Sequence, residues 1–239
     1  VRLAAEMGRD FDGELVRFGG GKLWVDGSMG TGDAWMSEPL DDDPLDFGSH
    51  YFSNTDLDEI VSLSEELGLP LKLHVNGDAA VSAALDAFEV TAAARGGLSQ
   101  VHVLDHLVLI SDEDRTRIRE LGLMTSMQPS HYLPASFGDT AQRWGERFDH
   151  AYDFRAMLDA EIPLAMGTDW PVWPAPEPLV TVFAAVSLAS DHGLSVAEAL
   201  RGSTVAGAMA IGRSDVLGHL DLGAQADVVI LSADPLAVD

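Results

Sequence analysis

The sequence has 239 residues, of which 46% are hydrophobic, a content typical of a globular protein with its own core. Its 39 acidic and 14 basic residues give a formal net charge of -25 at pH 7, which argues against nucleic acid and anionic membranes as partners. The absence of cysteine excludes disulfides and thiolate-bound metal. No apolar run approaches the roughly 20 residues that span a bilayer, and none resembles a secretory signal. From these features together we expect a cytoplasmic protein.

The first part of the chain predicts a strand, a long loop and a helix. Residues 22–25 follow three glycines and form a short apolar strand. Residues 31–54 are rich in Gly, Pro, Asp and Ser and are long for a plain connection, so we expect a substrate-covering loop. The apolar spacing that follows predicts a helix over 55–67, capped by Thr55 or Asp56.

Strand and helix patterns then alternate. Further strands are predicted at 69–75, 100–104, 123–127 and 162–166. Helices are predicted after the turn and cap at 76–78 to about 95, from Ser111 onward with a capping-box sequence at 111–114, at 150–160, after the loop at 170–178 to about 190, at 198–201 after a capping-box sequence at 195–198, and from Thr204 to about 211. Five strands that alternate with helices predict an α/β fold with a parallel sheet and helices outside it.

The end of the chain departs from this alternation of strands and helices. A turn-like stretch precedes residues 228–231, which read as a strand with no helix after it. We therefore expect two units, a main α/β unit over 1–215 and a segment of a small β domain over 216–239.

Polar residues that suit a metal site occur at equivalent places in successive strand units. Lys22 lies on the first strand and His74 on the second, His106 lies just after the third, and Asp169 lies just after the fifth. Neutral imidazoles and carboxylates bind zinc, and a catalytic zinc keeps a position for water. A buried lysine loses its proton readily and can react with carbon dioxide, and the two oxygens of the resulting carbamate suit a bridge between two cations.

Each of these residues also has a purely structural alternative. Asp169 can cap the helix that follows Pro171, and Lys22 can be an ordinary exposed lysine. His74 can be a core histidine bonded to the backbone, and His106 can cap a strand end. The ordered recurrence of all four residues favours the metal site.

Four segments contain these residues, and a fifth forms the C-terminal tail. They are Gly-Lys-Leu-Trp-Val-Asp-Gly-Ser (21–28), His-Val-Asn-Gly-Asp-Ala-Ala-Val (74–81), Asp-His (105–106), Gly-Thr-Asp-Trp-Pro-Val (167–172) and Gly-His-Leu-Asp-Leu-Gly-Ala-Gln-Ala-Asp-Val-Val-Ile-Leu (218–231). In this order they resemble the motifs of the amidohydrolase superfamily, most of all its YtcJ-like branch, which includes N-substituted formamide deformylases.

The resemblance implies a (β/α)8 TIM barrel of the metal-dependent hydrolase type, here strands four to eight, plus a C-terminal strand of a small β-sandwich domain. It implies that Lys22 is a carboxylated bridging lysine and that His74 and His106 bind the second metal. Asp169 would bind the first metal, take a proton from metal-activated water and pass it to the leaving nitrogen. The implied cofactor is a divalent metal, zinc, as one or two ions.

Two further residues are expected at the mouth of the pocket. His131 follows the predicted strand at 123–127, and Trp170 follows Asp169. We expect both to contact a small-molecule substrate, with loop packing as the alternative role for the tryptophan.

One motif of the superfamily is absent. The chain has no His-x-His pair, the motif with which the family begins its barrel. We therefore expect the C-terminal portion of a longer enzyme, with a missing N-terminal segment, or a chain that assembles as a homo-oligomer. The expected activity is hydrolysis of a carbon–nitrogen bond in an amide, formamide or cyclic amide. The alternatives are an esterase or deaminase of the same superfamily and a catalytically incomplete fragment.

Overall fold

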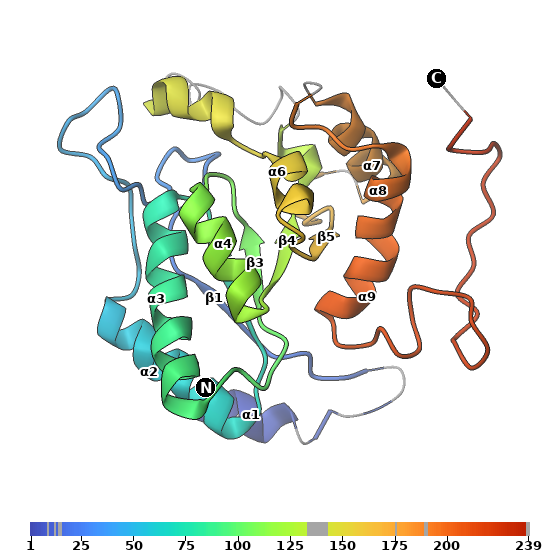
Figure 1. The fold of residues 1–239 in the computed structure, drawn as a ribbon, viewed down its shortest axis with the longest axis horizontal. Coiled ribbons are helices and arrows are strands. Elements are labelled where there is room, and N and C mark those ends of the chain that lie inside the picture. The colour runs from blue at the N-terminus through green and yellow to red at the C-terminus, as the bar shows by residue number, and fades with distance from the viewer. Residues whose placement is uncertain are drawn as a thin grey trace.

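A parallel sheet of five strands, which lie side by side in chain order, forms the centre of the molecule (Figure 1). The computed structural model describes residues 1–8, 10–11, 13, 16–132, 143–174, 176–188 and 191–237. The strands are β1 (Gly21–Trp24), β2 (Leu71–Val75), β3 (Val103–His106), β4 (Met124–Met127) and β5 (Leu164–Met166). The predicted α/β fold with a parallel sheet is confirmed. Within the described residues β1 and β5 each pair with one neighbour, so the sheet is open at both edges.

Helices follow the strands and cover the sheet. The helices are α1 (Arg2–Gly8), α2 (Asn54–Leu67), α3 (Asp78–Arg95), α4 (Asp112–Leu121), α6 (Phe154–Asp159), α7 (Pro178–Ser187), α8 (Val196–Arg201) and α9 (Gly207–Ala210). Helix α3 packs against β2 and against both α2 and α4, whereas α9 packs on β4 and β5 (Figure 1). Among the described helices, none is long and apolar enough to cross a membrane.

Side-chain caps decide where several helices begin. The cap of α2 is Ser53, not Thr55 or Asp56 as predicted. The Ser53 hydroxyl accepts the backbone N–H of Asp56 at 3.2 Å, and the Asp56 carboxylate accepts the backbone N–H of Ser53 at 2.9 Å. Asp56 thus completes a capping box from inside the helix. The capping box predicted at Ser195 is confirmed. At Ser111 the side chain accepts the backbone N–H of Asp114 and so caps α4, but the reciprocal bond of the predicted capping box is not among its described contacts.

Two predicted helices have different bounds. In place of one helix at 150–160 there is a 3-10 turn, η3 (Gly145–His150), followed by α6, because the Asp153 side chain accepts the N–H of Ala156 and starts a new helix there. The helix predicted from Thr204 instead continues α8 through a π-helical stretch, η4 (Gly202–Ala206), into α9. A Cβ on Gly202 would lie 3.0 Å from the Met166 side chain, so the small residue lets this helix rest on β5.

The strand predicted at 228–231 does not form. Val228, Val229 and Ile230 are 65%, 82% and 93% exposed, and they lie outside every helix and strand that the structure describes. A strand is stable only when a neighbour satisfies its backbone hydrogen bonds, and the apolar pattern alone does not supply that neighbour.

The long loop predicted at 31–54 is held in place by packing and by an arginine. Met36 and Leu40 are buried in the core. Arg143 donates to the carbonyl of Gly32 at 2.7 Å and to the carboxylate of Asp46 at 2.6 Å. This loop therefore has a defined path. The sequence also predicts a long loop at 128–146, which lies partly outside the described residues, since 133–142 are not described.

A buried polar cluster ties α2 to the segment that leads into β3. The Glu65 carboxylate accepts the backbone N–H groups of Ser99 and Gln100 and the Nε2 proton of His102 at 2.9 Å. His102 Nδ1 accepts the N–H of Leu71 at 3.1 Å, which fixes the neutral tautomer with its proton on Nε2. Burial raises the pKa of Glu65, but the hydrogen bonds from Ser99, His102 and Gln100 outweigh it and lower the pKa to about 2.

We predict that Glu65→Gln lowers the free energy of unfolding by about 2 kcal/mol at pH 7. The glutamine NH2 group would replace one carboxylate oxygen, so N–H groups that now donate to that oxygen would face another donor and lose their acceptor. The stability that the carboxylate contributes is present above its unfolded pKa near 4.5 and is lost as the pH falls toward about 2. Urea unfolding should therefore show a variant deficit that shrinks between pH 5 and pH 3. The matched control is Glu66→Gln on the exposed side of α2; an equal loss in the control would contradict the prediction.

Candidate metal centre

The functional candidates gather around one cavity at the carboxyl end of the sheet. The cavity has a volume of about 740 Å³, and Lys22, His74, His106, His131 and Asp169 all line it. They meet because the carboxyl ends of parallel strands lie at the same edge of a sheet, where connecting segments can carry side chains inward.

Three of these residues form a compact group. One nitrogen each from His106 and His131 and one carboxylate oxygen of Asp169 lie within 4.8 Å of one another. Within the described part of the chain, the Nε2 of His131 is buried without a hydrogen-bond partner, and it lies 3.7 Å from Asp169 Oδ2. Two imidazoles and a carboxylate are a donor set that zinc accepts, so the residues present fit a divalent metal ion.

Burial sets the protonation of this group. Burial lowers the pKa of His131, and it lowers the pKa of His106 well below its usual range with help from the nearby His74 and Lys22. Both imidazoles are therefore neutral at pH 7, which is the form that binds metal. Burial raises the pKa of Asp169, whereas His131 and Lys22 act in the opposite direction.

The backbone is unusual at two members of the group. His106 has φ 78° and Asp169 has φ 55°, both in the left-handed region that residues other than glycine rarely adopt. These conformations occur where the chain leaves β3 and β5, and they fit a site at which function maintains local strain.

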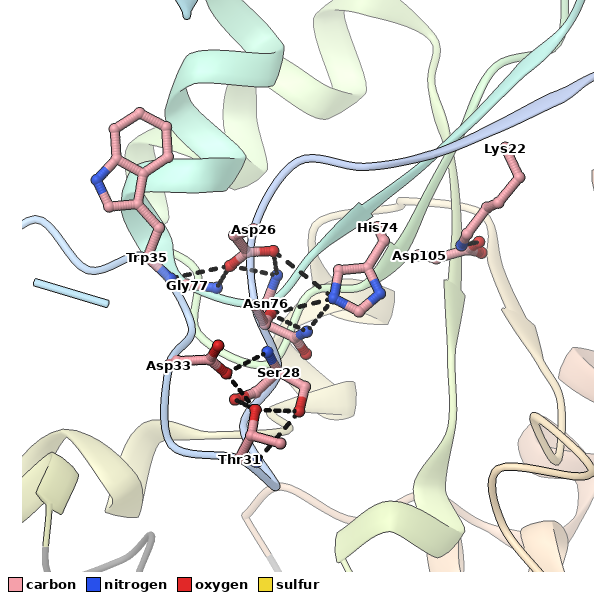
Figure 2. A network of polar contacts seen from close by, with 11 residues as sticks. Lys22, Asp26, Ser28, Thr31, Asp33, Trp35, His74, Asn76, Gly77 and Asp105 are labelled. Atoms are coloured by element: carbon pink, nitrogen blue, oxygen red, sulfur yellow. Dashed lines mark hydrogen bonds and ion pairs between the residues drawn. The ribbon is translucent and has the colours of Figure 1, made fainter. Parts of the chain in front are cut away.

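Lys22 makes an ion pair with Asp105 instead of joining the three-residue group (Figure 2). Trp24, His74 and Asp105 are register partners on β1, β2 and β3, so their side chains share one face of the sheet. Lys22, two residues before Trp24, shares that face and bridges to β3 across β2. The sequence motif Asp-His at 105–106 contained this partner, but only its histidine was assigned a role.

His74 lies beside the three-residue group, and its ring also contacts Asn76 and the backbone of Gly27. Its ring centroid is 4.4 Å from that of His106. Its Nε2 lies 2.7 Å from Asn76 Nδ2 and 3.1 Å from the carbonyl oxygen of Gly27. Burial lowers the pKa of His74, so the ring is neutral. His74 therefore combines the two roles weighed from the sequence, since it lines the cavity and is also bonded to the backbone.

Of the two residues predicted at the pocket mouth, one lines the cavity and the other does not. His131, predicted to contact substrate, belongs to the possible metal-binding group. Trp170 is 61% exposed and is not among the residues that line the cavity, whereas Trp173 lines it with its ring 6.1 Å from that of His131. His131 follows β4 as His106 ends β3, and this position was the signal that would have marked it as a candidate ligand.

Asp26 was not predicted and is fully buried just after β1. Its carboxylate accepts the backbone N–H groups of Trp35, Asn76 and Gly77 at 3.0, 3.0 and 2.9 Å. Burial raises the pKa of Asp26 to about 7, although these three hydrogen bonds lower it. Its place directly after a predicted strand, like that of Asp169, was the available signal.

An α/β fold with two imidazoles and a carboxylate at the carboxyl ends of parallel strands fits the class of metal-assisted enzymes. The family model described as "Amidohydrolase family" matches residues 2–239, so the chain belongs to the amidohydrolase family.

Curated relatives match nearly all of this chain. The chain is 30% identical over 231 residues to Protein LONG AFTER FAR-RED 3 of Arabidopsis thaliana, covering 92% of this chain and 40% of that protein. It is 28% identical to the putative amidohydrolase YtcJ of Bacillus subtilis and 25% identical to the N-substituted formamide deformylase of Arthrobacter pascens, covering 95% and 93% of this chain. These matches span 44% and 42% of those proteins, so the chain covers less than half the length of each.

Solved structures agree with this assignment. An uncharacterized metal-dependent hydrolase from Pyrococcus furiosus superposes with a TM-score of 0.85 at 32% identity, covering 98% of this chain and 49% of that chain. The predicted membership in this branch of the amidohydrolase superfamily is confirmed.

We predict a measurable coupling between Lys22 and Asp105. Their side chains are 33% and 11% exposed, so the ion pair is partly shielded from water. A double-mutant cycle with Lys22→Met and Asp105→Asn should give a coupling energy of about 1 kcal/mol in urea unfolding. The control cycle uses Arg115 and Asp112, whose acid is 95% exposed, and should give a coupling near zero. Equal couplings in the two cycles would refute the prediction.

Proposed function

We propose that this chain provides the metal-binding part of a hydrolase that cleaves a carbon–nitrogen bond in an amide, formamide or cyclic amide. The observation that carries the proposal is the group of His106, His131 and Asp169, whose ligand atoms lie within 4.8 Å of one another beside a cavity. The similarity to a protein named N-substituted formamide deformylase supports the bond type.

The proposed cofactor is a divalent metal, zinc. His106, His131 and Asp169 would hold one ion, and when bound it would polarise a carbonyl group and acidify water. Asp169 would hold and move the proton, because its raised pKa and its exposure to the cavity suit a carboxylate that both accepts and returns one. His131, 3.7 Å away, would orient that carboxylate.

A second ion is proposed on the other side of His106. His74 and Lys22 line the same cavity there, and carboxylation of Lys22 would supply the bridging oxygens. The same modification would place an anion beside Asp105, with which the unmodified ammonium is paired. Carboxylation of Lys22 therefore requires a cation to replace the charge that Asp105 loses, so the second ion and the modification would occur together.

The extent of the protein bears on activity. We propose that residues 1–215 are strands four to eight of a barrel with their helices and that 216–239 lead into a small β-sandwich. The chain covers 40% to 44% of three curated relatives. This coverage, together with the open edges of the sheet, favours a catalytically incomplete fragment as the second candidate. Ester hydrolysis and deamination remain alternatives within the same chemistry.

We predict that His131→Ala lowers zinc affinity by at least about tenfold, because it removes one of three ligands. The matched control is His150→Ala, which replaces an exposed histidine outside the cavity and should leave the affinity unchanged. Competition titration with a zinc indicator measures the affinity, and release of amine from a panel of N-substituted formamides, amides and esters measures turnover. Equal zinc affinity in both variants would refute the metal group, whereas zinc binding without turnover would favour the incomplete fragment.

A further inference from the structure

Asp26 joins three segments that are distant in the sequence (Figure 2). Its two carboxylate oxygens accept the N–H groups of Trp35 in the long loop and of Asn76 and Gly77 in the turn after β2. Since Asp26 is itself the second residue after β1, one buried side chain holds the end of β1, the loop and this turn together. No substitution reproduces three accepted hydrogen bonds in the same space, because only a carboxylate offers acceptors on both oxygens.

The loop passes directly over the turn that Asp26 holds. A Cβ on Gly77 would lie 1.9 Å from the carbonyl oxygen of Trp35, a distance that no side chain tolerates. Glycine at this position therefore permits the approach, and Asp26 supplies the hydrogen bonds that maintain it. The turn and the start of the loop form one unit.

This unit holds the His74 ring. Asn76 Nδ2 donates to the carbonyl of Gly27 at 2.9 Å and lies 2.7 Å from His74 Nε2. The carbonyl oxygen of Gly27 also lies 3.1 Å from His74 Nε2. The Asn76 amide and this carbonyl therefore both hold the Nε2 side of the ring in place. Figure 2 shows the other ring nitrogen, Nδ1, on the side of Lys22 and Asp105, away from the network.

We propose that Asp26 is a positioning residue for His74. By holding the turn at Asn76 and Gly77 against the end of β1, it keeps the Asn76 amide on His74 Nε2. It thereby fixes the ring orientation and holds the ring in a single tautomer, with Nδ1 presented to the cavity. Asp26 does not touch substrate or metal in this role. The inference rests on the proposed function only through the place of His74 in the site.

The test is a long-range 1H–15N spectrum of the histidine side chains in the metal-free full chain, which reports the tautomer without any need for activity. We expect His74 of the unmodified chain to show a single tautomer. Asp26→Asn has the same shape but turns an N–H group toward the backbone donors, so it should convert His74 to a tautomer mixture. In the same variant, Co²⁺ affinity should fall about tenfold, as for other residues that orient a metal ligand.

Two further variants make the test specific. Asp78→Asn is the control, because the Asp78 carboxylate accepts the N–H of Ser37 at 2.9 Å and ties the same loop to α3 without contacting His74. It should leave the His74 signal unchanged. Asn76→Ala removes the amide that contacts Nε2 and should therefore also give a tautomer mixture at His74. This variant tests the proposal even if Asp26→Asn does not fold.

An unchanged His74 signal in Asp26→Asn or in Asn76→Ala would overturn the proposal, as would an equal change in Asp78→Asn. A tautomer mixture in the unmodified chain would also overturn it. Failure of the unmodified chain to bind Co²⁺ would instead contradict the proposed function, while the metal-free spectra would still decide the role of Asp26.

Discussion

Parallel pairing of five short strands brings their carboxyl ends to one edge of the sheet, and every polar contact around the cavity depends on that alignment. The register places His74 of β2 opposite Asp105 of β3, and Lys22 on β1 reaches the same carboxylate from the other flank. His106 ends β3 and Asp169 follows β5, so the chain must turn sharply at both places. The left-handed backbone at these two residues is the local consequence.

The polar side chains at this edge can be buried because the histidines are uncharged and the carboxylates accept hydrogen bonds. The histidines are neutral, since burial lowers their pKa values, and a neutral imidazole costs less to bury than a charged one. Asp26 is buried with three backbone donors, and Glu65 has several donors from the chain before β3. The two carboxylates thus play similar architectural parts, one beside the cavity and one at the opposite end of β2.

The accuracy of prediction from sequence depended on how local each signal was. Apolar runs predicted all five strands, because strand burial leaves a pattern within a few residues. Serine caps marked helix starts at Ser111 and Ser195, although at Ser53 the partner carboxylate was mistaken for the cap. The pattern at 228–231 was equally clear and yet forms no strand, because a strand also needs a neighbour, and the pattern contains no information about one.

The sequence by itself determined the parallel α/β class and the candidate positions of Lys22, His74, His106 and Asp169, because strand ends can be recognised from local periodicity. Only the tertiary structure decided which side chains meet. It grouped His131 with His106 and Asp169, paired Lys22 with Asp105, and made Asp26 the junction of three segments. Such contacts join residues far apart in the chain, and their distances follow from strand register and loop path, which no local pattern encodes.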